Sequence, residues 1–361
     1  MLRTFIIAEA GVNHNGSLEL ALKLIDVAAA AGADAVKFQT FKSGAVISKH
    51  AVKAEYQIRN VGGDDDQLSM VRKLELSDAD HHVLVEYCKK KKIEFMSTPF
   101  DLESLALLVD KIGVNRLKIP SGEITNAPLL LAAAATGKPL IVSTGMCNLQ
   151  DIRDALGVLA YGFTHANPSK NRPVLNDFQK ALASSEGQKA LKEKVNLLHC
   201  TTEYPAPLED VNLLAMDLMR SEFGLSVGYS DHTKGIMVPV AAVALGADII
   251  EKHFTLDRNM PGPDHVASLE PDELAMMVER IRQIEVSLGK RTKCPAPSEI
   301  KNMPIARKSL VASRAIRKGE VFSEENLTAK RPGSGVSPMH YWVWIGSIAD
   351  RDYEADELLG S

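Results

Sequence analysis

The chain has 361 residues, of which 45% are hydrophobic and 24% are charged, and its formal net charge is −4. This balance is typical of a globular protein and excludes a disordered chain, a collagen-like repeat and a coiled-coil rod. Because the net charge is not positive, nucleic acid and anionic lipid are not expected as partners. At roughly 150 residues per domain, the length predicts two domains, or one large domain with an appendage.

The sequence also indicates the compartment. The most apolar stretch, residues 237–250, is shorter than the roughly 20 residues of a membrane span. Residues 1–4 lead directly into a β-rich segment and do not have the pattern of a signal peptide. The four cysteines are scattered and form no C-x-x-C pair, which favours buried, reduced thiols over disulfides or a zinc site. We therefore expect a cytoplasmic protein that does not enter a membrane.

Up to Gly289, β-rich runs alternate with helical patterns. Ser17 is a typical N-cap for the first helix, and Gly32 is placed to end it. Further helices are predicted at 77–91 and 271–288, the last with Pro271 in its first turn. Strands are predicted at residues 4–10, 33–40, 93–98, 116–120, 139–144, 195–201, 226–230 and 248–255.

Eight strands, each followed by a helical pattern, predict a (β/α)8 TIM barrel. The main alternative is an open doubly wound sheet. Such sheets usually carry a glycine-rich nucleotide motif, G-x-G-x-x-G or G-x-x-x-x-G-K-[ST], and the sequence has neither at the required place.

Two segments depart from the alternation. Residues 41–70 form a long connection that we predict to be irregular, and such loops are usually functional or disordered. Residues 163–193 are polar and are interpreted as a surface insertion without a catalytic role. After Gly289 the composition changes: residues 290–305 contain three prolines and are predicted to be a linker, and residues 306–361 are predicted to be a small β-rich domain.

In a barrel of this kind, catalytic residues lie at the carboxyl ends of the strands. Polar residues end all eight predicted strands, which indicates one common pocket. They are Glu9, Lys37, Gln39, Ser97, Thr98, Lys118, Ser121, Glu123, Ser143, Thr144, Thr201, Thr202, Tyr204, Ser230, Asp231, His232, Glu251 and His253.

Two lysines in this ring, Lys37 and Lys118, are accompanied by the hydroxyls of Thr98, Ser121 and Ser143. Lysine supplies a point charge and hydroxyls supply short hydrogen bonds, so this set is suited to a phosphate. A single lysine at a strand end is more often an exposed charge, but two at neighbouring positions favour an anion site.

His232 and His253 end adjacent strands. Two imidazoles could hold a divalent metal there, with Glu9 as a nearby carboxylate and water in the open positions. The alternative is a pair of structural histidines. Glu123 is a candidate general acid or base, and its alternative is an ion pair with one of the lysines.

Taken together, the motifs resemble those of the bacterial sialic acid synthase family, whose C-terminal part is an antifreeze-like (SAF) domain. The resemblance covers nearly the whole chain. It rests on residues 8–16 (AEAGVNHNG), 36–40 (VKFQT), 97–100 (STPF), 118–123 (KIPSGE), 143–146 (STGM), 199–201 (HCT), 230–233 (SDHT), 251–255 (EKHFT), 261–264 (PGPD) and 330–335 (KRPGSG).

The resemblance implies a transferase that condenses phosphoenolpyruvate with an open-chain N-acetylated amino sugar. Carbon 3 of phosphoenolpyruvate attacks the aldehyde, water adds at carbon 2, and the carbon–oxygen bond to phosphate breaks. It implies a divalent metal held by His232 and His253, usually manganese, with magnesium and cobalt as alternatives. That metal would polarise the aldehyde oxygen.

The resemblance also implies residue roles. Glu9, Lys118 and Glu123 are expected in catalysis, Glu123 in proton transfer and Glu9 beside the metal. Arg331 is expected to reach the sugar's N-acetyl group from the partner subunit, which implies a homodimer with the SAF domain exchanged. The expected substrate-binding residues, sugar contacts included, are Lys37, Gln39, Thr98, Ser121, Ser143, Thr202, Tyr204, Ser230 and Asp264; Thr202 stands where some members have Asn.

Three functions are left open at this point. The first is an N-acetylneuraminate synthase that uses N-acetylmannosamine. The second is a legionaminic or pseudaminic acid synthase that uses a 6-deoxy-diacetamido sugar. The third is a non-catalytic sugar-binding protein, which would be expected to lack Lys37, Lys118, His232 or His253, and all four are present.

Overall fold

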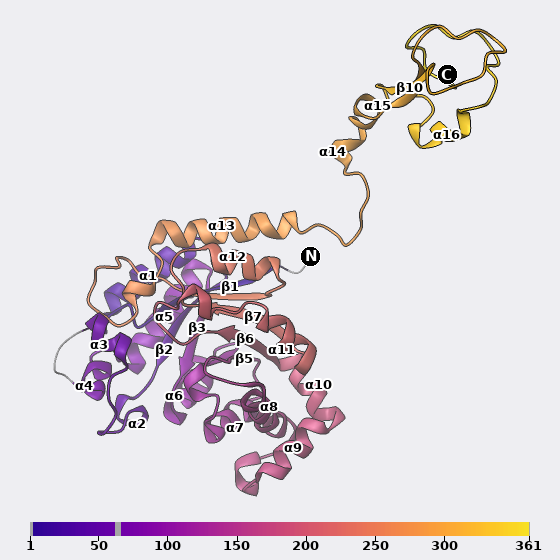
Figure 1. Cartoon of the computed structure of the whole chain (residues 1–361). Coiled ribbons are helices and arrows are strands. Elements are labelled where there is room, and N and C mark those ends of the chain that lie inside the picture. Colours follow the sequence, from indigo (N-terminus) through magenta and orange to yellow (C-terminus); the bar gives the residue numbers. More distant parts are fainter. Residues whose placement is uncertain (1–2, 62–65, 361) are drawn as a thin grey trace. The chain divides into compact units, whose positions relative to one another are not determined.

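The computed structural model describes residues 3–61 and 66–360 (Figure 1). The chain divides into two compact units. Unit 1 ends at Gly289 and unit 2 begins at Lys290.

Unit 1 contains eight strands, and each overlaps a predicted one. They are β1 (Phe5–Gly11), β2 (Ala35–Thr40), β3 (Glu94–Pro99), β4 (Leu117–Ile119), β5 (Leu140–Ser143), β6 (Val195–Cys200), β7 (Ser226–Asp231) and β8 (Ile249–His253). They form one sheet in the order β3-β2-β1-β8-β7-β6-β5-β4, in which neighbouring strands run parallel. The two ends of this order, β3 and β4, also lie side by side, so the sheet is a nearly closed barrel. The predicted TIM barrel is confirmed.

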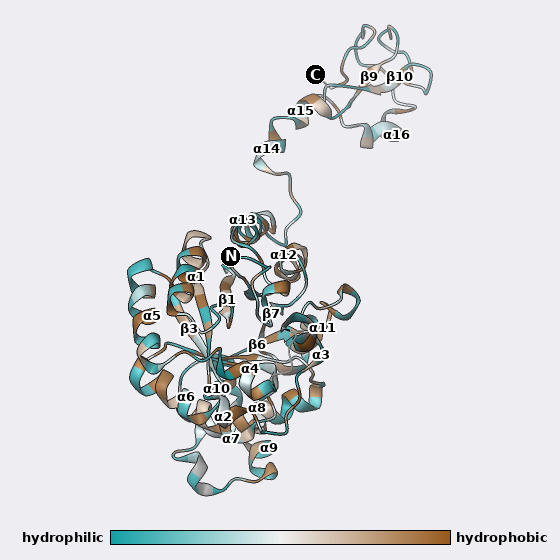
Figure 2. Ribbon diagram, turned by 90° about the vertical axis from the view of Figure 1, so that its left-hand side faces the viewer, coloured by the Kyte–Doolittle hydropathy of each residue, from teal (hydrophilic) through white to brown (hydrophobic). Residues whose placement is uncertain are grey.

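Helices surround the strands of unit 1 (Figure 1). In Figure 2 many of these helices are banded in teal and brown, as expected for helices with one face on a sheet. Their bounds are α1 (Leu18–Ala30), α2 (Ser43–Val46), α3 (Glu55–Val61), α4 (Gln67–Arg72), α5 (Asp78–Lys91), α6 (Leu102–Ala106), α7 (Ala127–Ala135), α8 (Leu149–Thr164), α9 (Leu175–Ala183), α10 (Ser185–Lys194), α11 (Ala215–Phe223), α12 (Met237–Ala244) and α13 (Pro271–Ser287).

The predicted ends of α1 are confirmed, and the local chemistry explains them. The Ser17 side chain accepts a hydrogen bond from the amide of Leu20, which satisfies one of the free amides of the first turn. Gly32 has φ +78°, a left-handed conformation that glycine adopts without a Cβ clash. This turn directs the chain from α1 into β2.

The prediction that residues 41–70 are irregular is wrong for part of this segment. These residues contain α2, α3 and most of α4, while positions 62–65 lie outside the described residues. The Asp66 side chain caps α4 by accepting from the amide of Ser69. The alternation rule missed these helices because each is less than two full turns long and has no clear apolar period.

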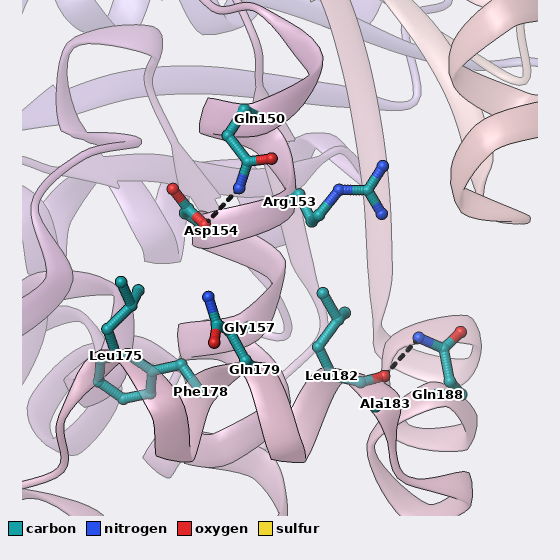
Figure 3. A pocket seen from close by; sticks show the side chains of 10 residues that line it. All are labelled: Gln150, Arg153, Asp154, Gly157, Leu175, Phe178, Gln179, Leu182, Ala183 and Gln188. Atoms are coloured by element: carbon teal, nitrogen blue, oxygen red, sulfur yellow. Dashed lines mark hydrogen bonds between the residues drawn. The ribbon is translucent and has the colours of Figure 1, made fainter.

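The insertion at 163–193 is also folded. It forms a short 3-10 turn (Pro168–Asn171), then α9 and most of α10, which pack against α8. A cavity of about 490 Å³ lies in this region (Figure 3). It is lined from α8 by Gln150, Arg153, Asp154 and Gly157 and from the α9 and α10 region by Leu175, Phe178, Gln179, Leu182, Ala183 and Gln188, none of which ends a barrel strand.

Unit 2 is built around a two-stranded antiparallel sheet, β9 (Ser309–Ala312) and β10 (Leu327–Lys330). Short helices α14 (Pro297–Ile300) and α15 (Met303–Ala306) precede the sheet, and α16 (Tyr341–Trp344) follows it. Its core contains Leu310, Ile316, Phe322, Leu327, Tyr353 and Leu359. The predicted small β-rich domain is confirmed. No helix in the described part of the chain is long and apolar enough to cross a membrane.

Candidate active site

The site is built in layers along the inside of the barrel. Ile7, Ala35, Met96, Ile141, Leu198 and Ile249 form one buried apolar cluster, with one residue from each of six strands. Side chains of a strand alternate between its two faces, so the inward residue that follows each of them lies two positions further on. Those residues are Glu9, Lys37, Thr98, Ser143, Cys200 and Glu251. Gln39 and His253 also face inward, because they lie two positions after Lys37 and Glu251 on the same strands.

The lower polar layer is a buried cluster of four charges: Glu9, Lys37, Lys118 and Glu251. Lys37 Nζ lies 2.7 Å from Glu9 Oε2 and 3.6 Å from Glu251 Oε2, and Lys118 Nζ lies 3.2 Å from Glu251 Oε1. Ser230 Oγ donates to Glu251 Oε1 at 2.8 Å. All four charged side chains are at most 5% exposed, so their charges interact strongly with one another and with any ion that enters.

The four groups differ in how they hold protons. Burial raises the pKa of Glu9 to about 7 against the attraction of Lys37, and the neighbouring Glu251 carboxylate adds to the rise. Burial would also raise the pKa of Glu251, but the attraction of Lys118 and Lys37 outweighs it and the pKa is lowered. Burial lowers the pKa of Lys118, whereas the carboxylates of Glu251 and Glu9 outweigh burial at Lys37 and raise its pKa. Glu9 is thus the carboxylate of the cluster that takes up a proton more readily.

Hydroxyl groups complete an anion cradle beside the lysines. Lys37 Nζ donates to Thr98 Oγ1 at 3.1 Å. Ser143 Oγ and Thr202 Oγ1 are buried and have no hydrogen-bond partner within residues 3–61 and 66–360. Buried polar atoms are normally paired, so two unpaired hydroxyls at this end of the barrel indicate a place for a polar ligand.

Gly145 leaves this cradle open. Its amide donates to Ser121 Oγ at 3.0 Å. A Cβ built on Gly145 would lie 2.3 Å from Thr202 Oγ1 and 2.8 Å from Ser121 Oγ, closer than real Cβ atoms come. The backbone therefore approaches the cradle at a distance that only glycine allows.

The upper layer holds the two predicted metal ligands. The ring centroids of His232 and His253 are 5.5 Å apart. His232 Nδ1 lies 2.6 Å from the Thr201 carbonyl oxygen, which can only accept, so Nδ1 carries the proton and Nε2 keeps its lone pair. The buried His253 Nδ1 has no hydrogen-bond partner in the part of the chain that the structure describes. Burial lowers the pKa of His232 to about 4 and that of His253 well below its usual value, so both rings are neutral at pH 7.

These features fit a divalent cation. Across the two described ranges, no group of three or more His, Cys, Asp and Glu side chains is arranged to hold a metal ion. His232 and His253 offer two neutral imidazole ligands, and the remaining positions would be left to water or substrate oxygens.

The predicted sugar contacts lie around the same histidines. Tyr204 packs on His232 with a centroid distance of 4.2 Å and meets His253 edge-on at 5.6 Å. Asp264 Oδ2 is 3.9 Å from His253 Nδ1, and burial raises the pKa of Asp264 to about 6. Gln39 Nε2 donates to Glu9 Oε1 at 3.4 Å. Tyr204, Asp264 and Gln39 are therefore together with the histidines, above the charged cluster.

One predicted residue of unit 1 is not brought into this cluster. Glu123 lies in a 3-10 turn (Ser121–Glu123) and accepts from Asn126 Nδ2 at 2.6 Å, next to the start of α7. The alternative of an ion pair with Lys37 or Lys118 is not seen among the described contacts of Glu123. Arg331 is an exposed residue of unit 2, where its Nε donates to the Ala306 carbonyl at 3.0 Å.

Ser97 and Thr144 are members of the predicted ring that point away from the pocket. Ser97 Oγ is 2.6 Å from Thr40 Oγ1, and Thr144 Oγ1 donates to the Leu198 carbonyl at 2.9 Å. Ser97 directly precedes the inward Thr98, and Thr144 directly follows the inward Ser143. The alternation of side chains along a strand therefore places both on the outer side. The end of a strand alone does not distinguish the inner face from the outer face, so the sequence prediction included both residues.

Sequence reasoning placed Glu251 in the ring but gave it no role. The structure makes it the centre of the charged cluster, since it contacts both lysines and Ser230. The available signal was its position, two residues before His253 on the same strand. A residue at that spacing faces the same side of the strand as the histidine.

In (β/α)8 barrel enzymes the active site lies at the strand ends, and here that end carries buried lysines, unpaired hydroxyls and two neutral imidazoles. A model of the NeuB family matches residues 24–293, and a model of the SAF domain matches residues 307–360. The chain belongs to the NeuB family, so the resemblance to sialic acid synthases is confirmed. It is a sugar acid synthase, of the class that condenses phosphoenolpyruvate with a sugar.

Individual relatives are similar over nearly the whole chain. N,N'-diacetyllegionaminic acid synthase of Campylobacter jejuni is 52% identical over 99% of both chains. The enzyme of the same name from Legionella pneumophila is 46% identical over 98% of this chain and 93% of its own. The solved structure of N-acetylneuraminic acid (sialic acid) synthetase from Leptospira borgpetersenii is 37% identical, with a TM-score of 0.66 over 83% of this chain and 90% of that one. These relatives favour the second of the three predicted functions over the first.

Proposed function

We propose that this protein is an N,N'-diacetyllegionaminic acid synthase, which condenses phosphoenolpyruvate with 2,4-diacetamido-2,4,6-trideoxymannose. The observation that carries the choice of sugar is the 52% identity to the Campylobacter jejuni enzyme over 99% of both chains. The sialic acid synthetase of known structure is 37% identical over a smaller share of the chain. N-acetylneuraminate synthesis from N-acetylmannosamine is the second candidate.

The lower layer of the site is assigned to phosphoenolpyruvate. Its phosphate and carboxylate need cations and short hydrogen-bond donors, which Lys37, Lys118 and the hydroxyls of the cradle supply. In the free protein the two lysines are neutralised by Glu9 and Glu251. We assign phosphate binding to Thr98, Ser121, Ser143, Thr202 and Ser230 together with the two lysines.

The upper layer is assigned to the sugar, held by Gln39, Tyr204 and Asp264, and to a divalent cation, for which manganese is the first choice. His232 and His253 would hold the cation through ring nitrogens with free lone pairs. When bound, a divalent cation supplies Lewis-acid polarisation of the aldehyde oxygen.

The reaction needs one carbon–carbon bond and one water molecule. Carbon 3 of phosphoenolpyruvate bonds to the aldehyde carbon, the water oxygen adds at carbon 2, and the bond from carbon 2 to the phosphate oxygen breaks to leave a keto group. One water proton ends on the new hydroxyl and the other on inorganic phosphate. We assign the holding of one of these protons to Glu9, because Glu9 belongs to the charged cluster, whereas Glu123 accepts a hydrogen bond from Asn126, the N-cap of α7.

We also propose a homodimer in which unit 2 of one chain completes the site of its partner, with Arg331 at the sugar's N-acetyl group. Unit 2 offers a surface that supports association: Met339, Trp342 and Val343 are 75–85% exposed. Such an apolar group on a small domain is typical of a surface that another chain covers.

The test is phosphate release from phosphoenolpyruvate in the presence of manganese, run in parallel with the two sugars. We expect a higher kcat/KM for 2,4-diacetamido-2,4,6-trideoxymannose. A preference for N-acetylmannosamine would overturn the choice of sugar, and release without either sugar would overturn the synthase assignment. Lys37→Met measures the background rate, and Lys23→Met, at a 56% exposed position, is its matched control.

A further inference from the structure

A second buried ion pair lies next to the two histidines to which we assign the cation. Lys252 Nζ is 2.6 Å from Asp231 Oδ2, and both side chains are 0% exposed. Asp231 and Lys252 are opposite each other in the parallel pairing of β7 and β8. Each directly precedes a histidine, Asp231 before His232 and Lys252 before His253.

The pair points away from the substrate pocket. Ser230 and Glu251, one position earlier on each strand, hydrogen-bond to each other inside the barrel. By alternation the next residues, Asp231 and Lys252, face outward, and His253 faces inward again. The pair therefore does not touch a substrate that lies in the pocket, and its contacts are all with the protein.

These contacts hold the backbone on both sides of His232. Asp231 Oδ1 accepts from the Thr233 amide at 3.0 Å, and Asp231 Oδ2 accepts from Thr233 Oγ1 at 3.1 Å. Lys252 Nζ also donates to the Thr233 carbonyl. Tyr229 OH donates to Asp231 Oδ1 at 3.1 Å. His232 thus lies between Asp231, which carries this carboxylate, and Thr233, which is hydrogen-bonded to it.

The pair is hard to explain as a stabilising contact. Two charges taken out of water lose their hydration, and in other proteins an apolar pair of similar volume serves stability as well or better. What an apolar pair cannot supply is the directed bonding that fixes the Asp231–Thr233 turn to β8.

We propose that the Asp231–Lys252 pair is a positioning device that sets His232 and His253 at the spacing a divalent cation requires. This inference rests on the proposed metal role of the two histidines. Partners behind metal-binding residues orient the ligands, and their loss typically costs about 10–100-fold in metal affinity.

The test uses the double variant Asp231→Asn/Lys252→Met, which removes both charges and keeps an oxygen to accept from the Thr233 amide. We expect the melting temperature of the metal-free protein to change little, while the Kd for Mn²⁺, measured by electron paramagnetic resonance, rises about 10–100-fold. An unchanged Kd in a folded variant would overturn the inference. The matched control is Asp34→Asn/Arg282→Met, which removes an ion pair of 2.8 Å at the opposite ends of the strands and should leave the Kd unchanged.

A metal-free readout separates this inference from the proposed function. In protein labelled with ¹³C-histidine, the ring signals of His232 and His253 should shift or broaden in the double variant and not in the control. If wild-type protein fails to bind Mn²⁺ but the rings respond, the metal role fails and the positioning role stands. Unchanged ring signals would overturn the positioning role.

A milder variant serves if the double variant does not fold. Tyr229→Phe/Thr233→Val keeps both charges and removes two of the hydroxyl bonds to Asp231. We expect a several-fold rise in the Kd for Mn²⁺ at an unchanged melting temperature. A Kd equal to that of wild type would contradict the proposal.

Discussion

Lys118 Nζ lies 3.2 Å from Oε1 of Glu251, and the same carboxylate is 3.6 Å from Lys37. One carboxylate therefore serves two buried lysines. Glu9 is the other acid of the cluster, so the free protein holds two positive and two negative charges together. An entering anion changes this balance, and the variants below test how.

Glu251→Gln removes one negative charge from the cluster and leaves the two lysines with Glu9 alone. Breaking a buried ion pair from one side typically costs about 3–5 kcal/mol, so we expect the free energy of unfolding to fall by that order. The affinity for phosphoenolpyruvate should be unchanged or higher, because the excess positive charge attracts the anion. Denaturant unfolding and a phosphoenolpyruvate titration measure the two effects, and weaker binding would contradict the assignment of Glu251.

Lys118→Met changes the same cluster in the opposite direction. It leaves Glu9 and Glu251 with Lys37 as their cation, so stability should again fall by several kcal/mol. Here the affinity for phosphoenolpyruvate should drop at least 100-fold, because a cation that contacts the substrate is gone and the remaining charge repels it. Equal affinities in Lys118→Met and Glu251→Gln would exclude the lower layer as the anion site.

Gly145→Ala tests the cradle. The added methyl group would lie against Thr202 Oγ1 and Ser121 Oγ, so we expect the KM for phosphoenolpyruvate to rise about 10–100-fold, a loss of about 1.4–3 kcal/mol. The KM for the sugar should change little. Gly122→Ala is the control, since a Cβ there meets no atom within 4 Å. Equal effects of both substitutions on both substrates would contradict the role of Gly145.

Acid stability should depend on His14, which is fully buried and lies in the loop after β1. Burial lowers the pKa of His14 to about 4, while a histidine of the unfolded chain titrates near 6.5. Between these values the unfolded chain binds more protons, so the free energy of unfolding falls as the pH falls, by about 3 kcal/mol in full.

The variant His14→Asn isolates this effect, because Asn keeps an acceptor for the Gly16 amide, which now donates to His14 Nδ1 at 3.0 Å. Urea unfolding at pH 7.5 and pH 5 should show a stability loss about 2 kcal/mol smaller in His14→Asn than in wild type. Parallel losses in the two proteins would mean that His14 is protonated in the folded state.

Arg331 is tested by complementation. Lys118→Met and Arg331→Ala should each be almost inactive, one through unit 1 and the other through unit 2. In the proposed dimer, co-refolded mixtures contain sites made of an intact barrel and an intact unit 2 from different chains. Half of the dimers are then mixed, and each mixed dimer has one complete site out of two. Activity should therefore return to about a quarter of the wild-type value. No recovery would mean that each chain completes its own site.

Much of the fold could be predicted because its signals are local. Strand composition, Ser17 at a helix start and Gly32 at a helix end are all read from a few neighbouring residues. The short helices α2, α3 and α4 could not be predicted in this way, because their formation depends on packing more than on a periodic pattern.

The site could be predicted in part for the same reason. The sequence gives the strand ends, and so it places Lys37, Lys118, His232 and His253 at one end of a barrel. It does not show whether Glu251 or Glu123 forms the ion pairs with the two lysines. That Glu251 joins the cluster with Lys37 and Lys118 depends on distances between elements that are far apart in the chain.

The apolar cluster formed by Ile7, Met96, Leu198 and their neighbours blocks the barrel axis beneath the charged layer. Since this end of the barrel is closed, the substrates and products of the proposed reaction enter and leave through the other end. Because we assign phosphoenolpyruvate to the lower layer, we expect it to enter before the sugar, and we expect the sugar acid to leave before phosphate. In kinetic terms we expect a sequential mechanism in which free phosphate competes with phosphoenolpyruvate for the empty enzyme.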